Sequence, residues 1–209
     1  MMMNKEKDIL SYMDELYPSA RCELNYTFDY ELLIATVLSA QCTDKRVNEI
    51  THILWNKYDL ESLSKASNKE IEKIVRPLGS YTKKASYIKD IAKRIISECN
   101  GVVPNDRPYL ESLPGVGRKT CNVVLANIYN VPTIAVDTHV ERVSKRLRLS
   151  YQNDSVETVE RKLMKKFPKD KWNRLHHQLV LFGRYKCKAR KPLCDDCKLK
   201  CYCKYKGNK

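Results

Sequence analysis

Four cysteines near the C-terminal end constrain the fold more than any other feature of the chain. Cys187, Cys194, Cys197 and Cys203 form the pattern C-x6-C-x2-C-x5-C. Four thiolates this close together can surround one soft metal site, so the chain must fold back on itself here. Structural zinc and a cubane iron–sulfur cluster both accept four thiolates. Zinc sites usually show two close Cys pairs, and only one is present, so the spacing favours the cluster.

Five cysteines lie outside this quartet, and we expect different roles for them. Cys201 lies two residues before Cys203 and competes with it as the fourth ligand. The first residues, MMMNKEKDIL, lack the apolar core of a signal peptide, and no run of eighteen apolar residues occurs. We therefore expect a cytoplasmic protein without a membrane span. Free thiols or ligands are then expected rather than disulfides. The remaining four are predicted to be small buried apolar residues: Cys22, Cys42, Cys99 and Cys121.

Positive charge is concentrated in the last third of the chain. The 209 residues include 39 Lys and Arg against 25 Asp and Glu, and residues 133–209 alone hold 21 basic and 8 acidic residues. A one-sided positive field is typical of nucleic-acid binding, although a Lys-rich surface would give the same balance. Lys188, Arg190 and Lys191 lie between the first two cysteines of the quartet. A metal site at both ends of this loop would hold these cations rigidly toward DNA.

Apolar residues recur at helical spacing along most of the chain, and no strand-like alternation of convincing length is present. The pattern predicts an all-α protein, with a long apolar helix at 28–41. The stretch 105–130 reads as a helix, the turn PGVG and a second helix that opens with Arg118 and Lys119. The small residues Gly115 and Gly117 would let a phosphate approach the N–H groups of the second helix. An ordinary corner between two helices fits the same residues.

Several motifs, in this order, resemble the endonuclease III family of helix-hairpin-helix DNA glycosylases. They are LLIATVLSAQCTDKRVN, LPGVGRKTCNVV, IAVDTHVERVSKRL, HHQLVLFGRYKC and the cysteine pattern, and they span residues 31–203. The resemblance implies two helical domains with a DNA cleft between them. One would be a six-helix barrel at 22–132 that contains the hairpin motif at about 106–130. The other would join 1–21 to 133–209 and carry a [4Fe-4S] cluster on Cys187, Cys194, Cys197 and Cys203.

The resemblance also implies a bifunctional enzyme of base excision repair. Such an enzyme removes oxidised or ring-saturated pyrimidines from double-stranded DNA and cleaves the abasic site by β-elimination through a lysine Schiff base. Lys119 matches the catalytic lysine of the family. An amine must be neutral to attack, and the helix start and the adjacent Arg118 both disfavour its charged form. The resemblance implies a cytoplasmic, nucleoid-associated monomer that acts on damaged or abasic duplexes.

Asp137 matches the catalytic aspartate of the family. It precedes a predicted helix start, where Asp is usually only a cap. Thr138 and Glu141 fit a capping box, so we predict that Asp137 lies one residue outside the helix and is free to stabilise the developing positive sugar.

The remaining predicted site residues contact DNA. Gln41 matches the residue that the family inserts into the space left by a flipped-out base. The family has a second inserted residue, a leucine in a GLY turn, but this sequence reads GSY, with Ser80 at that place and Tyr81 after it. In the hairpin, the DNA contacts would come from Gly115, Val116, Gly117 and Arg118.

Two other functions fit part of the sequence. An adenine-mismatch glycosylase of the same superfamily shares the hairpin and the cluster, but it lacks a lysine at the place of Lys119. A non-catalytic DNA-binding module with a structural metal keeps the charge and the cysteines and leaves Lys119 and Asp137 without a role.

Overall fold

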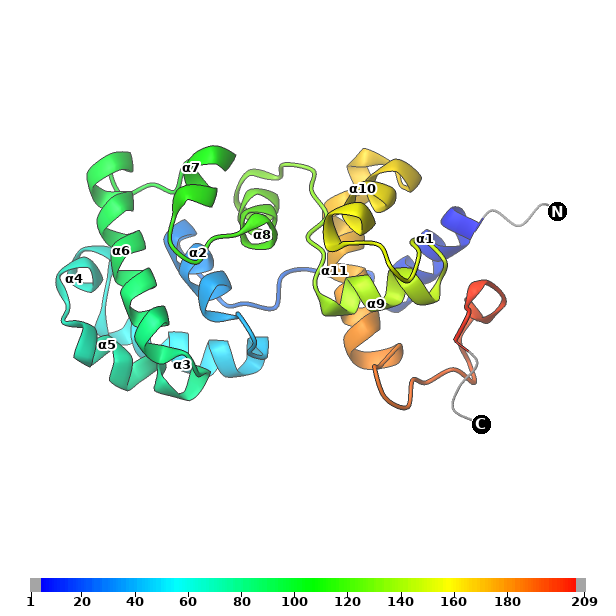
Figure 1. Ribbon diagram of the computed structural model, residues 1–209, viewed down its shortest axis with the longest axis horizontal. Helices are drawn as coiled ribbons and strands as arrows, with labels where there is room; N and C mark the ends of the chain where they lie inside the picture. The colour runs from blue at the N-terminus through cyan, green and yellow to red at the C-terminus, as the bar shows by residue number, and fades with distance from the viewer. Residues whose placement is uncertain (1–4, 206–209) are drawn as a thin grey trace. The chain divides into compact units, whose positions relative to one another are not determined.

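The computed structural model describes residues 5–205, which contain helices and connecting segments but no strand. The predicted all-α fold is confirmed. The chain divides into two compact units, one formed by Cys22–Tyr129 and the other by the segments on either side of it. The α-helices, labelled in Figure 1, are α1 (Lys5–Leu16), α2 (Asp29–Leu38), α3 (Asp44–Lys57), α4 (Leu60–Lys65), α5 (Asn68–Val75), α6 (Tyr81–Cys99), α7 (Arg107–Ser112), α8 (Arg118–Tyr129), α9 (Thr138–Arg146), α10 (Val156–Lys166) and α11 (Trp172–Leu181).

The unit Cys22–Tyr129 is built around α2 and α6. Helix α2 is apolar on almost all sides, and all its residues from Glu31 to Leu38 are buried, as expected for a helix in the middle of a core. The long helix α6 contacts α2, α4 and α5, and α8 packs on α2 (Figure 1). The helix predicted at 28–41 ends earlier, at Leu38, because the chain turns at Ser39 and Gln41 adopts a left-handed backbone conformation.

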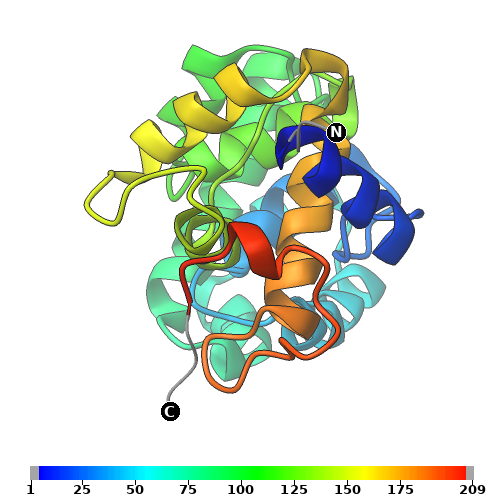
Figure 2. The same cartoon turned by 90° about the vertical axis from the view of Figure 1, so that its right-hand side faces the viewer.

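The second unit has its own apolar core. Helix α1 packs along α11 (Figure 2) and contributes Ile9 and Met13 to a cluster completed by residues such as Val140, Leu163 and Leu179. Helix α11 continues into a π-helical turn, η3 (Phe182–Lys186), which closes with a bond from the Cys187 N–H to the Phe182 carbonyl. Such turns are frequent at functional sites because they redirect the chain within one turn.

Among residues 5–205, no helix is both long and apolar enough to cross a membrane.

Candidate functional site

The hairpin between α7 and α8 requires glycine at position 115. Gly115 has φ +76°, and a Cβ there would lie 2.7 Å from Cδ2 of Tyr87 on α6 and 3.1 Å from Cγ1 of Val37 on α2. The side chain of Val116 is buried and anchors the loop, whereas a Cβ on the exposed Gly117 would meet no atom within 4 Å. The hairpin therefore lies against α2 and α6 and keeps open space at its second glycine, next to the start of α8.

Arg118 and Lys119 are the first two residues of α8, and both are exposed. The helix begins directly after the hairpin, with a bond from the Cys121 N–H to the Gly117 carbonyl at 3.0 Å. The Lys119 amine is thus carried by a rigid helix and is open to a ligand that approaches the hairpin.

Asp137 is the N-cap of α9, so the predicted capping box at Thr138 is wrong. The Asp137 backbone is extended, and its Oδ1 accepts the N–H groups of His139 at 2.9 Å and Val140 at 2.8 Å. Asp is among the best N-cap residues, and α9 accordingly begins at Thr138, while Glu141 pairs with Lys145. Both amide bonds go to one carboxylate oxygen, and Oδ2 makes no hydrogen bond within the described part of the chain.

Helix α9 is fastened to the segment that leads to the cysteines. Arg142 donates to the carbonyl oxygens of Gly183 at 2.7 Å and Cys187 at 3.2 Å. A Cβ on Gly183 would lie 2.7 Å from Cβ of His139, so the π-helical turn touches the first turn of α9. The helix that Asp137 caps is therefore held by the segment from Gly183 to Cys187.

Cys187, Cys194, Cys197 and Cys203 line one cavity of about 280 Å³. Cys201 is exposed and is not part of its wall. No group of three or more His, Cys, Asp or Glu side chains in residues 5–205 is arranged to hold a metal ion. The four cysteine side chains fit a group of several atoms that fills the cavity, because all four residues line its wall.

The surroundings of these thiols are partly apolar and partly cationic. Burial raises the pKa of the Cys197 and Cys203 thiols. Nη1 of Arg146 lies 3.4 Å from Sγ of Cys187, and Lys186 also lines the cavity. Arg146 therefore donates a hydrogen bond to the first sulfur of the quartet.

The basic loop after Cys187 exposes its three predicted DNA-contacting cations. Lys188, Arg190 and Lys191 are all exposed, and Lys191 has φ +49°. The Arg146 guanidinium binds the carbonyl oxygens of Lys188 at 2.7 Å and Ala189 at 3.0 Å. The loop is therefore held through its backbone, and its cationic side chains project into solvent.

The two predicted DNA-inserting positions share an unusual backbone. Gln41 (φ +60°) and Ser80 (φ +46°) are both exposed, and a left-handed conformation is uncommon for residues other than glycine. Ser80 directly precedes α6, and the ring of Tyr81, the first residue of that helix, lies 5.8 Å from the Arg76 guanidinium. Strain of this kind persists where the surroundings impose it and is frequent at functional sites.

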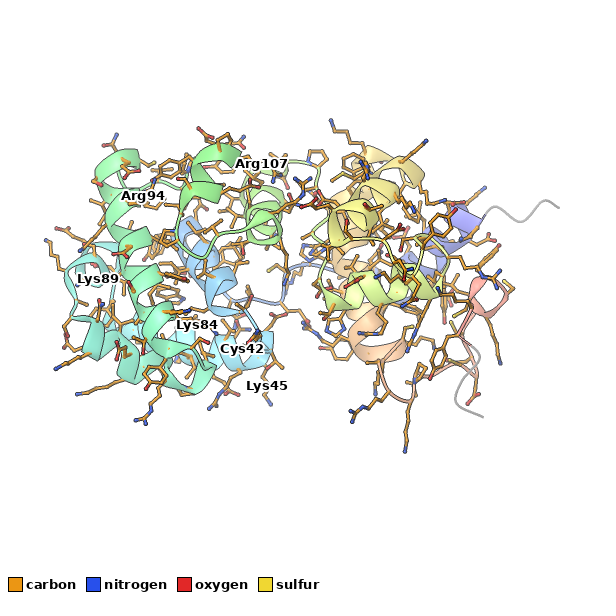
Figure 3. The ribbon with its side chains drawn as sticks, in the orientation of Figure 1. Cys42, Lys45, Lys84, Lys89, Arg94 and Arg107 are labelled. Carbon is orange, nitrogen blue, oxygen red and sulfur yellow. The ribbon has the colours of Figure 1, made fainter. Side chains whose placement is uncertain are left out.

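Sequence reasoning missed Lys84 and misread Cys42. Only Cys121 of the four cysteines predicted to be buried is buried, and burial raises its pKa to about 11. Cys42 instead donates from Sγ to the Leu78 carbonyl at 2.9 Å. Lys84 is buried, and its sequence signal is its place on the apolar stripe of α6, four residues before Ile88. Figure 3 shows Cys42 and Lys84 beside each other.

Comparison with known proteins gives a consistent result. Residues 34–169 match the model of the HhH-GPD superfamily base excision DNA repair proteins. The chain is 46% identical over 196 residues to endonuclease III of Bacillus subtilis (strain 168), covering 93% of this chain and 90% of the relative. It is 42% identical over 207 residues to endonuclease III of Escherichia coli (strain K12), covering 98% of each.

Solved structures agree with these relatives. A non-covalent endonuclease III–DNA complex superposes with a TM-score of 0.92 at 47% identity, covering 97% of this chain and 96% of the other. A thermostable thymine-DNA glycosylase superposes with a TM-score of 0.83 at 26% identity and 96% coverage of each chain. The resemblance inferred from the motifs is confirmed.

Proposed function

Because the chain belongs to the endonuclease III family within the HhH-GPD superfamily of base excision DNA repair proteins, and is thus a DNA glycosylase and abasic-site lyase, we propose that Lys119 carries both of its reactions. The observation that carries the proposal is the exposed position of Lys119 at the second residue of α8, directly after the hairpin. The same lysine distinguishes the chain from an adenine-mismatch glycosylase.

Base excision and strand cleavage need one nucleophile from the protein, the Lys119 amine. Nζ of Lys119 attacks the sugar C1′, and the bond from C1′ to the base breaks as the base leaves with its electron pair and takes up a proton. The nitrogen then loses a proton, O4′ takes up a proton as the sugar ring opens, and a protonated Schiff base with a free 4′ hydroxyl remains. This iminium acidifies the 2′ hydrogen, so its removal expels the 3′ phosphate by β-elimination. Water then hydrolyses the Schiff base and releases Lys119.

Asp137 assists through the oxygen that capping leaves available. Oδ1 is held by the amides of His139 and Val140, so the carboxylate orientation is set by α9. Oδ2 then stabilises the positive charge that develops on the sugar. Since an anchored carboxylate needs little reorganisation, capping contributes to this role.

Double-stranded DNA with a damaged base or an abasic site is the proposed ligand. A relative solved as an endonuclease III–DNA complex supports this choice. Gln41 fills the space of the flipped-out base, with Ser80 and Tyr81 at the neighbouring turn. The hairpin residues Gly115–Arg118 and the basic loop bind phosphates. Oxidised or ring-saturated pyrimidines are the proposed lesions, and the monomeric state and nucleoid localisation stay predictions.

Cys187, Cys194, Cys197 and Cys203 fit a [4Fe-4S] cluster, because these four thiols alone among the cysteines line the cavity. A bound cluster would supply a rigid cross-link within residues 187–203. The residues around it position the basic loop, since Arg146 binds both the Cys187 sulfur and the loop carbonyls.

Borohydride trapping tests the proposal. Reduction of the Schiff base should link the protein covalently to a duplex that carries an abasic site or an oxidised pyrimidine. Lys119→Ala should abolish both the adduct and strand cleavage while retaining most DNA affinity, and Lys93→Ala, which removes an exposed lysine from α6, should behave as the unmodified protein. An undiminished adduct in Lys119→Ala would place the nucleophile elsewhere. A chain that leaves abasic DNA intact would be a binding module only.

A further inference from the structure

Lys84 is a buried lysine that joins two separate turns. Its side chain extends from α6, and the residue is only 5% exposed. Nζ donates to the carbonyl oxygen of Ala40 at 3.0 Å and to that of Leu78 at 2.9 Å, and it lies 3.5 Å from Sγ of Cys42. An ammonium group has three N–H donors, and these three acceptors use all of them.

The two turns linked in this way are the ones that carry the proposed DNA-inserting positions. Ala40 directly precedes Gln41, and Leu78 lies two residues before Ser80. Within the first turn, the Cys42 N–H bonds to the nearby Ser39 carbonyl at 3.0 Å. In the second turn, the Gly79 N–H bonds to the Arg76 carbonyl at 3.2 Å. These bonds are local, so the side chains of Lys84 and Cys42 provide the polar links between the turns.

The linkage is a closed network. The Leu78 carbonyl accepts from both Lys84 and Cys42, and Cys42 also accepts from Lys84. Figure 3 shows the two side chains meeting between the end of α2 and the start of α6. Hydrogen bonds from a charged donor are shorter and stronger than neutral ones. One ammonium group that donates to both carbonyls therefore limits the distance between the two turns.

Stability alone does not explain a lysine at this place. Position 84 continues the stripe of Ile88, Ile91 and Ile95 on the buried face of α6, where an apolar side chain would be the ordinary choice. Burying a charge has a large desolvation cost, and apolar replacements of buried polar networks often retain or increase stability. An apolar side chain could not hold the Ala40 and Leu78 carbonyls at a fixed distance from each other, because it has no hydrogen-bond donor.

We propose that Lys84 is a positioning residue for base extrusion, which holds the turns of Gln41 and Ser80 at the separation needed to occupy the space left by the flipped-out base. The inference rests on the proposed role of Gln41 in that space. Turns ordered in advance bind with less loss of conformational freedom, so Lys84 acts on affinity for the opened duplex. Cys42 supports Lys84 through its shared acceptor.

Three DNA ligands test the inference with purified full-length protein. They are a duplex with a tetrahydrofuran abasic analogue, the single strand with the same analogue, and an undamaged duplex. Lys84→Met should weaken binding to the abasic duplex by about tenfold or more. Binding to the single strand and to the undamaged duplex, neither of which has a gap to fill, should change by less than about twofold. Lys93→Met, on the exposed face of the same helix, is the matched control and should change none of the three affinities.

A double-mutant cycle connects Lys84 to Gln41. If both residues act on the same gap, Lys84→Met combined with Gln41→Ala should be little worse than the weaker-binding single variant. Circular dichroism at the binding temperature establishes that each variant is folded. If Lys84→Met does not fold, Lys84→Gln replaces it in the same comparison. Glutamine keeps N–H donors, but its side chain is shorter and carries no charge.

The outcomes separate the inference from the proposed function. If Gln41→Ala weakens abasic-duplex binding but folded Lys84 variants do not, or if the two effects add fully, Lys84 is not a positioning residue and the role of Gln41 stands. If Gln41→Ala leaves abasic-duplex binding unchanged, the proposed role of its turn is wrong and the inference fails with it.

Discussion

Oδ1 of Asp137 accepts the Val140 N–H at 2.8 Å, which places a proposed catalytic carboxylate at the N-terminus of α9 as its cap. The helix end and the reaction therefore use the same side chain. The two roles are separable because an Asn side chain keeps an Oδ1 acceptor and loses only the charge and the second carboxylate oxygen.

Asp137→Asn should retain stability within about 0.5 kcal/mol, since Asn caps as well as Asp. It should lose most of the single-turnover rate of base excision. Asp137→Ala should lose that rate and also about 1 kcal/mol of the free energy of unfolding. Ser155→Ala is the matched control, because Ser155 caps α10 through the Thr158 N–H and should cost similar stability with a normal rate. A near-normal rate in Asp137→Asn would leave Asp137 as a cap only.

Gly115→Ala and Gly117→Ala should differ in stability. Alanine at 115 must adopt a positive φ, which costs roughly 1–2 kcal/mol, and must displace Tyr87. Alanine at 117 meets nothing within 4 Å, so urea unfolding should be nearly unchanged, while a methyl group beside the proposed phosphate site should weaken DNA binding. Equal stability of the two variants would contradict the packing described for the hairpin.

Cys203→Ser and Cys201→Ser should differ in metal content. The protein purified without oxygen should contain iron and inorganic sulfide and show broad visible absorption from sulfur-to-iron charge transfer. Cys203→Ser should lose this absorption, and Cys201→Ser should keep it, because Cys201 does not line the cavity. Stoichiometric zinc without iron would overturn the cluster assignment. Loss of the absorption in Cys201→Ser but not in Cys203→Ser would make Cys201 the fourth ligand.

Arg190→Ala should change the salt dependence of DNA binding. One lost phosphate contact lowers the slope of log K against log salt concentration by about 0.9 for duplex DNA. The effect should be similar for damaged and undamaged duplexes, since phosphates carry no lesion information. Lys65→Ala removes an exposed lysine of α4 that pairs with Glu61, and its slope should equal that of the unmodified protein. Equal slopes for both variants would exclude Arg190 from the interface.

Much of this protein was predictable from local sequence. Helical spacing and the glycine-bracketed turn predict the helices on both sides of the hairpin, because backbone preferences act over a few residues. Asp is a preferred N-cap residue, and Asp106 caps α7 through the Tyr109 N–H at 3.1 Å. The cysteine spacing predicts that the four side chains lie together, and all four line one cavity, because residues close in sequence are easily brought together.

Tertiary structure decided the choices between equivalent local patterns. Asp137 and Thr138 are both good caps, and only the path of the chain placed the helix start after Asp137. Cys201 and Cys203 are similarly spaced from Cys197. The turn η4 (Lys200–Tyr202) leaves Cys201 exposed and brings Cys203 back to the cavity.

Lys84 is the clearest case of a role that sequence did not indicate. Local rules assign a lysine on a helix to solvent, because its charge is costly to bury. Its burial depends on the Ala40 and Leu78 carbonyls, which lie 44 and 6 residues away and converge on Nζ only in the folded chain. A sequence pattern records which groups a residue carries, whereas the partners that compensate for burying them are brought together by packing.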